Sequence, residues 1–191
     1  MSLPICLYTD GSAIRNPGPS GIGYVIVYHT EEEGKPPIPH ELDGSQGFRL
    51  STNNRMEIMA CLYGLRRINE LLDDGTIKDS YQINVTSDSE YLVKAINLNW
   101  ITKWQQNQWM TSGFQGKKPR PVANQDLWEE FIGIQEDFRK RGVIITMTHI
   151  QGHSGHEYNE RCDKMAVAAS GDSSNYKIDT EYEKRNLSGA R

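Results

Sequence analysis

The sequence predicts one α/β domain built on a mixed sheet with helices on its faces. Three apolar segments rich in β-branched and aromatic residues come first, at 3–9, 21–29 and 40–50, with turn residues between them. This order is typical of an antiparallel meander. Strand-like and helix-like segments then alternate to about residue 169, which is typical of helices packed on a sheet. We therefore expect three antiparallel strands followed by parallel strands.

Each later element has its own signal. Ser51 and Thr52 can cap a helix whose apolar residues recur at helical spacing as far as about Leu72. Asp-Asp-Gly follows, and it favours a turn. The remaining chain predicts a strand at 82–86, a short helix after 87–89, a Trp-rich loop-like segment at 97–125, a helix at 126–141, a strand at 143–149 and a helix from 159 to about 169. We expect a domain at 1–170 and a weakly ordered polar tail at 171–191.

Composition excludes several classes of protein. With 191 residues, 37% of them hydrophobic, the chain can bury one core. Its net charge of −4 excludes a uniformly basic nucleic-acid coat, although not a local basic patch. No apolar run approaches the ~20 residues of a membrane span, and the first residues do not resemble a secretory signal. Three scattered cysteines form no CxxC pair, so we expect a reducing compartment.

Four acidic residues stand out by their positions. Asp10 and Asp88 each end a predicted strand, whereas Glu57 and Asp163 lie early in predicted helices. If the two strands are neighbours and the helices pack on the sheet, the four carboxylates meet at one place. Carboxylates so close repel one another, and such a cluster persists when cations neutralise it. Oxygen ligands of this kind select Mg²⁺ or Mn²⁺.

Each of these carboxylates also has a purely structural explanation. Asp10 can belong to a turn with Gly11, and Asp88 can cap a short helix. Glu57 can complement a helix dipole, and Asp163 can be a surface residue of its helix. Taken singly, the residues leave both explanations open.

The segments around these residues resemble the motifs of type 1 ribonuclease H. The first block is Tyr8-Thr9-Asp10-Gly11-Ser12, and the second is Thr52-Asn53-Asn54-Arg55-Met56-Glu57. Ser87-Asp88-Ser89 resembles the third block. Gln151-Gly152-His153-Ser154-Gly155-His156, followed by Asn159-Glu160-Arg161-Cys162-Asp163, resembles the last. The blocks occur in the order of the family and span nearly all of the predicted domain.

The resemblance implies a ribonuclease H-like fold with a five-stranded mixed sheet flanked by helices. It implies hydrolysis of the RNA strand of RNA–DNA hybrids, giving 5′-phosphate and 3′-hydroxyl ends with little sequence preference. Asp10, Glu57, Asp88 and Asp163 would be the catalytic carboxylates that hold two Mg²⁺ ions, with Mn²⁺ as a substitute. His153 would assist proton transfer or product release. We expect a monomer, with no membrane and no protein partner implied, and the resemblance implies a cytoplasmic location.

His153 and His156 have a spacing of three, which raises zinc as an alternative. A structural zinc site needs four ligands, and no cysteine stands in this loop. A mobile histidine whose pKa lies near neutrality fits His153 better. For His156 we favour an ordinary anchoring role.

A cationic segment offers a surface for nucleic acid. Residues 97–125 contain no acidic side chain and four basic ones, so the segment carries +4 and the rest of the chain −8. By resemblance this is the handle that grips the DNA strand. It differs from lysine-rich relatives at Gln105-Gln106-Asn107-Gln108, so we expect weaker hybrid binding with a shallower salt dependence. The basic residues are Lys103, Lys117, Lys118 and Arg120, interleaved with Trp100, Trp104 and Trp109. We expect Trp100, Trp104 and Trp128 to be packing residues.

The resemblance assigns further contacts to the hybrid. Asn16, Asn53 and Asn54 would lie in its minor groove, where the 2′-hydroxyl distinguishes RNA from DNA. Thr52 and Asn124 match a pocket for a DNA phosphate, and Lys103, Trp104, Lys117 and Lys118 would bind the strand at the handle. Asn16 is equally well explained as a turn residue.

Two other functions compete with this interpretation. One is a different nuclease on a related fold, such as a proofreading exonuclease or a junction resolvase. The Asn-rich second block and the handle-like segment argue against it. The other is a hybrid-binding module without activity, which would have no reason to keep four mutually repelling acids.

Overall fold

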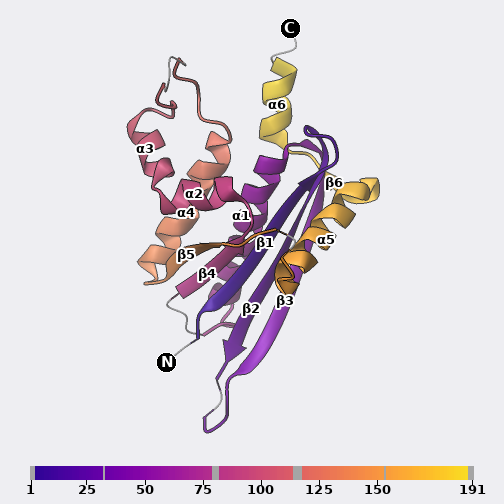
Figure 1. The fold of residues 1–191 in the computed structure, drawn as a ribbon. Helices are drawn as coiled ribbons and strands as arrows, with labels where there is room; N and C mark the ends of the chain where they lie inside the picture. The colour runs from indigo at the N-terminus through magenta and orange to yellow at the C-terminus, as the bar shows by residue number, and fades with distance from the viewer. Residues whose placement is uncertain (1–2, 32, 79–81, 114–117, 153, 189–191) are drawn as a thin grey trace.

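The computed structural model describes residues 3–31, 33–78, 82–113, 118–152 and 154–188, and its sheet has six strands in the order β5-β4-β1-β2-β3-β6 (Figure 1). The central strands β1, β2 and β3 are antiparallel to one another, while β4, β5 and β6 join the sheet in parallel. The predicted mixed sheet is confirmed. The strands are β1 (Ile5–Ala13), β2 (Gly18–Thr30), β3 (Ile38–Ser51), β4 (Gln82–Ser87), β5 (Ile144–His149) and β6 (Tyr176–Lys177).

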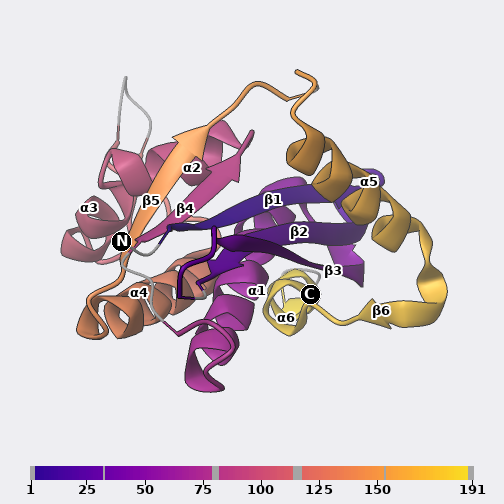
Figure 2. The same ribbon diagram turned by 90° about the horizontal axis from the view of Figure 1, so that it is seen from below.

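Helices cover both faces of the sheet. Figure 2 shows α5 on one side of the central strands and α1 with α4 on the other. The helix α1 packs on β1 and β2 through a buried apolar stripe that includes Met56, Ile58 and Leu65. The helices are α1 (Asn53–Asp73), α2 (Glu90–Asn97), α3 (Trp100–Gln106), α4 (Gln125–Lys140), α5 (Glu157–Gly171) and α6 (Thr180–Ser188), with a 3₁₀ turn at Ser173–Asn175.

Two glycines let helices approach the strands closely. A Cβ atom at Gly11 of β1 would lie 2.4 Å from the backbone nitrogen of Glu57 in α1. A Cβ atom at Gly23 of β2 would lie 2.3 Å from the carbonyl oxygen of Cys162 in α5. Gly23 pairs with Asp10 across the antiparallel ladder. Both helices therefore approach the sheet at the level of Asp10, where only glycine leaves room for them.

The Trp-rich segment contains a helix that we did not expect. Instead of a continuous loop, α3 spans Trp100–Gln106. Trp104 lies 5.9 Å from the ring of Trp128, which is fully buried, and 6.0 Å from the ring of Trp100. Trp109 also packs against the main core. The expected packing roles of Trp100, Trp104 and Trp128 are confirmed, and their stack fixes α3 on α4.

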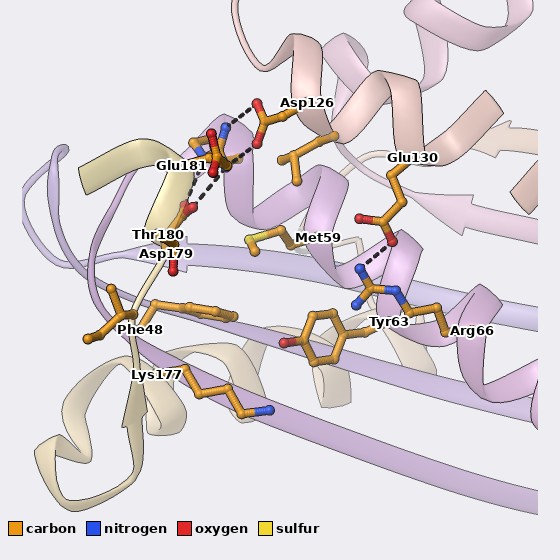
Figure 3. A pocket seen from close by; sticks show the side chains of 13 residues that line it. Phe48, Met59, Tyr63, Arg66, Asp126, Glu130, Lys177, Asp179, Thr180 and Glu181 are labelled. Carbon is orange, nitrogen blue, oxygen red and sulfur yellow. Dashed lines mark hydrogen bonds and ion pairs between the residues drawn. The ribbon is translucent and has the colours of Figure 1, made fainter. Parts of the chain in front are cut away.

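The expectation of a weakly ordered tail was wrong for residues 171–188. The tail adds β6 to the edge of the sheet beside β3, which explains the sixth strand, and it continues into α6. Its anchor is Asp179, whose buried carboxylate accepts from Ser51 Oγ at 2.6 Å and from Arg55 Nε at 2.7 Å. Arg55 is also buried and binds Asp126 of α4 at 2.8 Å (Figure 3). One buried ionic network thus joins the tail, α1 and α4.

No helix in the described part of the chain has the length and apolar character that crossing a bilayer requires.

We predict that Asp179→Ala lowers the free energy of unfolding by about 3 kcal/mol, because it leaves the buried Arg55 guanidinium with one carboxylate instead of two. Urea denaturation in chelator measures the change. Glu181→Ala is the matched control, since this neighbouring carboxylate forms an exposed pair with Lys184 and its loss should matter little. Equal stabilities for Asp179→Ala and the wild type would contradict the anchoring role.

Candidate active site

Three carboxylates from distant parts of the chain converge at one end of the sheet. Asp10 of β1, Glu57 of α1 and Asp88 after β4 each offer an oxygen, and these oxygens lie within 4.8 Å of one another. The strand register explains the first pair, because Tyr8 of β1 lies opposite Thr86 of the parallel β4. Asp10 and Asp88 follow two residues later at matching positions. Glu57 joins them because Gly11 admits α1 so closely.

Asp163 lies near this group but outside the set of three. It is half-buried on α5, one residue after Cys162, which packs over Gly23. Its charge contributes to raising the pKa of Asp10. The structure therefore places the fourth predicted carboxylate within electrostatic reach of the other three, on the opposite face of the sheet from α1.

The site is electrostatically strained without a cation. Burial, followed by the charges of Asp88 and Asp163, raises the pKa of Asp10 to about 7. Burial and the same kind of repulsion, from Asp10 and Asp88, raise the pKa of Glu57 well above its usual range. Glu57 Oε2 is buried and has no hydrogen-bond partner among the described residues. A cluster of largely buried carboxylates, with one buried oxygen that has no described partner, fits a hard divalent cation.

Backbone and amide donors hold the carboxylates in place. The Gly11 N–H donates to Asp10 Oδ1 at 2.7 Å, and Asn53 Nδ2 donates to Glu57 Oε1 at 3.3 Å. The Asn53 N–H in turn donates to Asn16 Oδ1 at 3.2 Å. Asn16 and Asn53 thus lie beside the carboxylate cluster, and Asn54 next to them is exposed to solvent.

The expected phosphate pocket residues sit at two helix starts that Arg55 connects. Thr52 caps α1 and accepts from the Arg55 N–H at 3.4 Å. Asn124 precedes α4 in a left-handed conformation and accepts from Arg55 Nη1 at 3.5 Å. Arg55 therefore contacts both predicted phosphate ligands, Thr52 through its backbone N–H and Asn124 through its guanidinium.

The predicted handle residues lie on and after α3. The side chain of Lys103 is exposed and donates to the Leu98 carbonyl oxygen at 3.3 Å. Lys118 is also exposed. A surface hollow of about 660 Å³ lies here, lined by Trp100, Lys103, Trp104, Asn107, Met110 and Ser112. Lys117 lies outside the described residues, as does His153 of the glycine-rich loop. His156 packs against Tyr8 with ring centroids 5.2 Å apart and the rings tilted by 43°.

Comparison with known proteins decides the family. The family model described as RNase H matches residues 3–171. The chain belongs to the ribonuclease H family. The resemblance predicted from the sequence blocks is confirmed. A ribonuclease H of Aeromonas salmonicida is 43% identical over 168 residues, covering 87% of this chain and 90% of the relative. One from Rippkaea orientalis is 35% identical over 183 residues, covering 96% and 94%.

Solved ribonuclease H structures share the fold. LC9-RNase H1, described as a type 1 RNase H with the type 2 active-site motif, has a TM-score of 0.67 at 25% identity. The match covers 100% of this chain and 82% of that one. LC11-RNase H1 in complex with an RNA/DNA hybrid has a TM-score of 0.51 at 28% identity, covering 86% of this chain and 95% of that one.

The structure also shows residues at this site that we did not predict. Arg55 organises both helix starts, and Asn159 of α5 reaches Asp88 with its amide. A signal for Asn159 exists in the sequence, because it shares a helical stripe with the apolar Cys162 and Ala166. A polar residue on such a stripe indicates a buried polar contact.

We predict that Asp10→Asn stabilises the metal-free protein at neutral pH. Between about pH 4 and pH 7 the folded Asp10 carboxyl stays protonated, because its pKa is about 7, while the unfolded one ionises. The free energy of unfolding of the wild type therefore falls as the pH rises through this window. The variant should gain roughly 2 kcal/mol at pH 7.5 and nothing at pH 4.

Thermal and urea unfolding in chelator at several pH values measure this difference. Asp137→Asn, which removes an exposed carboxylate on α4, is the matched control and should show no such pH trend. A gain that is larger at pH 4 than at pH 7.5 would contradict the electrostatic assignment.

Proposed function

We propose that this chain is an endoribonuclease that hydrolyses the RNA strand of RNA–DNA hybrids. The convergence of Asp10, Glu57 and Asp88 within 4.8 Å, in a chain of the ribonuclease H family, carries the proposal. The relative LC11-RNase H1, solved with an RNA/DNA hybrid, supports the hybrid as the substrate. The expected products carry 5′-phosphate and 3′-hydroxyl ends.

Asp10, Glu57, Asp88 and Asp163 are the residues that would hold two Mg²⁺ ions, with Mn²⁺ as a substitute. The unpartnered Glu57 Oε2 and the raised pKa of Asp10 support a cation at this position. When bound, such a pair of cations would supply an activated water and neutralise charge on the scissile phosphate. The donors from Gly11 and Asn53 would keep two of the carboxylates oriented toward the cations. We assign proton transfer or product release to His153.

The residues around the carboxylates would select the hybrid. Asn16, Asn53 and Asn54 are proposed to contact its minor groove, since Asn16 and Asn53 form a hydrogen-bonded pair next to Glu57. Recognition by 2′-hydroxyl groups and groove shape leaves base edges unread, so little sequence preference is expected.

Thr52 and Asn124, joined by Arg55, would bind a DNA phosphate. Lys103, Trp104, Lys117 and Lys118 would grip the same strand. We propose a monomer that acts in the cytoplasm.

We predict cleavage of the labelled RNA strand of a hybrid in Mg²⁺ and in Mn²⁺, and none in chelator. Duplex DNA, duplex RNA and single strands should remain intact. Asp10→Asn should reduce the rate to that of the buffer control while its circular dichroism stays native, since one carboxylate of the cluster is lost. Degradation that starts only at chain ends would instead favour an exonuclease. Tight hybrid binding without cleavage would favour a binding module.

A second prediction concerns the handle. Gln105 and Gln108 are exposed on or just after α3, where lysine-rich relatives carry charge. Gln105→Lys with Gln108→Lys should strengthen hybrid binding and steepen the slope of log K against log salt by about 0.9 for each new phosphate contact. Fluorescence anisotropy in Ca²⁺ over a salt series measures both quantities.

Gln135→Lys is the control for charge alone, because it adds an exposed lysine two turns beyond Trp128 on α4. An equal effect from this control would show that the handle does not contact the DNA strand.

A further inference from the structure

Among the clustered carboxylates of Asp10, Glu57 and Asp88, that of Asp88 is held least by the element that carries it. Asp10 receives a backbone N–H from Gly11, and Glu57 lies within α1. Asp88 instead follows the last residue of β4 and precedes Ser89, the N-cap of α2. A ligand carboxylate in such a connection needs support from other elements to keep one orientation.

That support comes from the segment between β5 and α5. The Ile150 N–H donates to the Ser87 carbonyl oxygen at 3.1 Å, and His149 donates through Nε2 to the Asp88 carbonyl oxygen at 3.1 Å. Gly152 then passes so close that a Cβ atom there would lie 2.7 Å from Asp88 Oδ2. The backbone and one face of the Asp88 side chain are therefore enclosed by this segment.

Asn159 completes the enclosure from α5. Its Nδ2 lies 3.5 Å from Asp88 Oδ2, the same oxygen that Gly152 approaches. Asn159 is only 3% exposed, and it occupies a stripe with Cys162, Ala166 and Ser170 that faces the sheet. Burying an amide without full compensation is unfavourable, and Asn159 Oδ1 has no partner in the part of the chain that the structure describes. Packing alone would favour an apolar residue here.

We propose that Asn159 is a positioning residue, which donates to Asp88 Oδ2 and so holds this carboxylate toward the cation site. The inference rests on the proposed function. A carboxylate accepts at both oxygens, so an amide on one leaves the other available to a cation. The same contact ties α5, which carries Asp163, to the strand end that carries Asp88.

Asn159→Ala and Asn159→Asp test this proposal. Metal binding is measured by calorimetry with Mn²⁺ and no hybrid, and kcat and KM are then measured with hybrid over a Mg²⁺ series. Both variants should weaken Mn²⁺ binding about 10–100-fold. They should also raise the Mg²⁺ concentration for half-maximal rate and lower kcat, with little change in KM. An added negative charge by itself would strengthen cation binding, so equal or tighter Mn²⁺ binding by Asn159→Asp would overturn the proposal.

Asn69 provides a matched control. It also lies on a helix, donates through Nδ2 to an aspartate at 3.3 Å and has a buried Oδ1 without a described partner, but it is remote from the site on α1. Asn69→Ala and Asn69→Asp should leave Mn²⁺ binding and kcat unchanged. Wild-type Mn²⁺ affinity and kcat in Asn159→Ala would overturn the proposal.

Gly152→Ala tests the position of the Asp88 carboxylate from the loop before α5, without changing any residue of α5. Its added methyl group would collide with Asp88 Oδ2, so Mn²⁺ binding and kcat should fall as for Asn159→Ala. If Asn159→Ala does not fold, this variant decides, and normal Mn²⁺ affinity in it overturns the proposal. If the wild type binds Mn²⁺ but cleaves no hybrid, the proposed function fails while the Mn²⁺ comparison still tests the role of Asn159.

Discussion

The repulsion among Asp10, Glu57 and Asp88 is the constraint on which the rest of the structure depends. Three acidic oxygens within 4.8 Å do not assemble on their own, so rigid elements must force them together. The parallel pairing of β1 with β4 sets two of them side by side, and Gly11 admits the helix that carries the third. Burial, and after it the charges of Asp88 and Asp163, raise the pKa of Asp10 to about 7. The same strain gives a divalent cation its affinity for this place.

Repulsion within the carboxylate cluster opposes folding, and the buried ionic network around Arg55 lies where it can offset that cost. Arg55 lies two residues before Glu57 at the start of α1, with Asp179 and Asp126 as its ionic partners. The guanidinium also reaches Asn124 at the start of α4. The tail therefore clamps the two helix starts next to the carboxylate cluster. Through Asp179 and Arg55, the described part of the C-terminal segment is thus linked to the start of the helix that carries Glu57.

The sheet could be predicted from the sequence because alternating apolar residues and turn residues are local signals. Periodicity also placed Asp10 on a strand and Glu57 on a helix, but the four acids were grouped into one site by the resemblance of the blocks around them. The order of the tail could not be predicted, because it depends on contacts with residues far away in the sequence, such as the pairing of β6 with β3 and the ion pair of Asp179 with Arg55, 124 residues apart. The helix α3 was missed because Trp, Gln and Asn give a weak helical signal, and the packing of Trp104 on Trp128 decides its conformation. Asn159 was missed because its partner, Asp88, comes from another element.

Positive and negative charges lie in different segments of the chain, which affects how an acidic site can bind a negatively charged substrate. A cluster of carboxylates repels the phosphates that it must approach, and the whole chain carries −4. The segment at 97–125 carries +4, and its described part includes α3, which lies beside α2 (Figure 1). In the proposed function, attraction for the DNA strand would act at this segment and not beside the carboxylates, where a lysine would compete with a cation. Cations held by the proposed ligands would neutralise the acids locally, so metal binding and hybrid binding would favour each other by linkage.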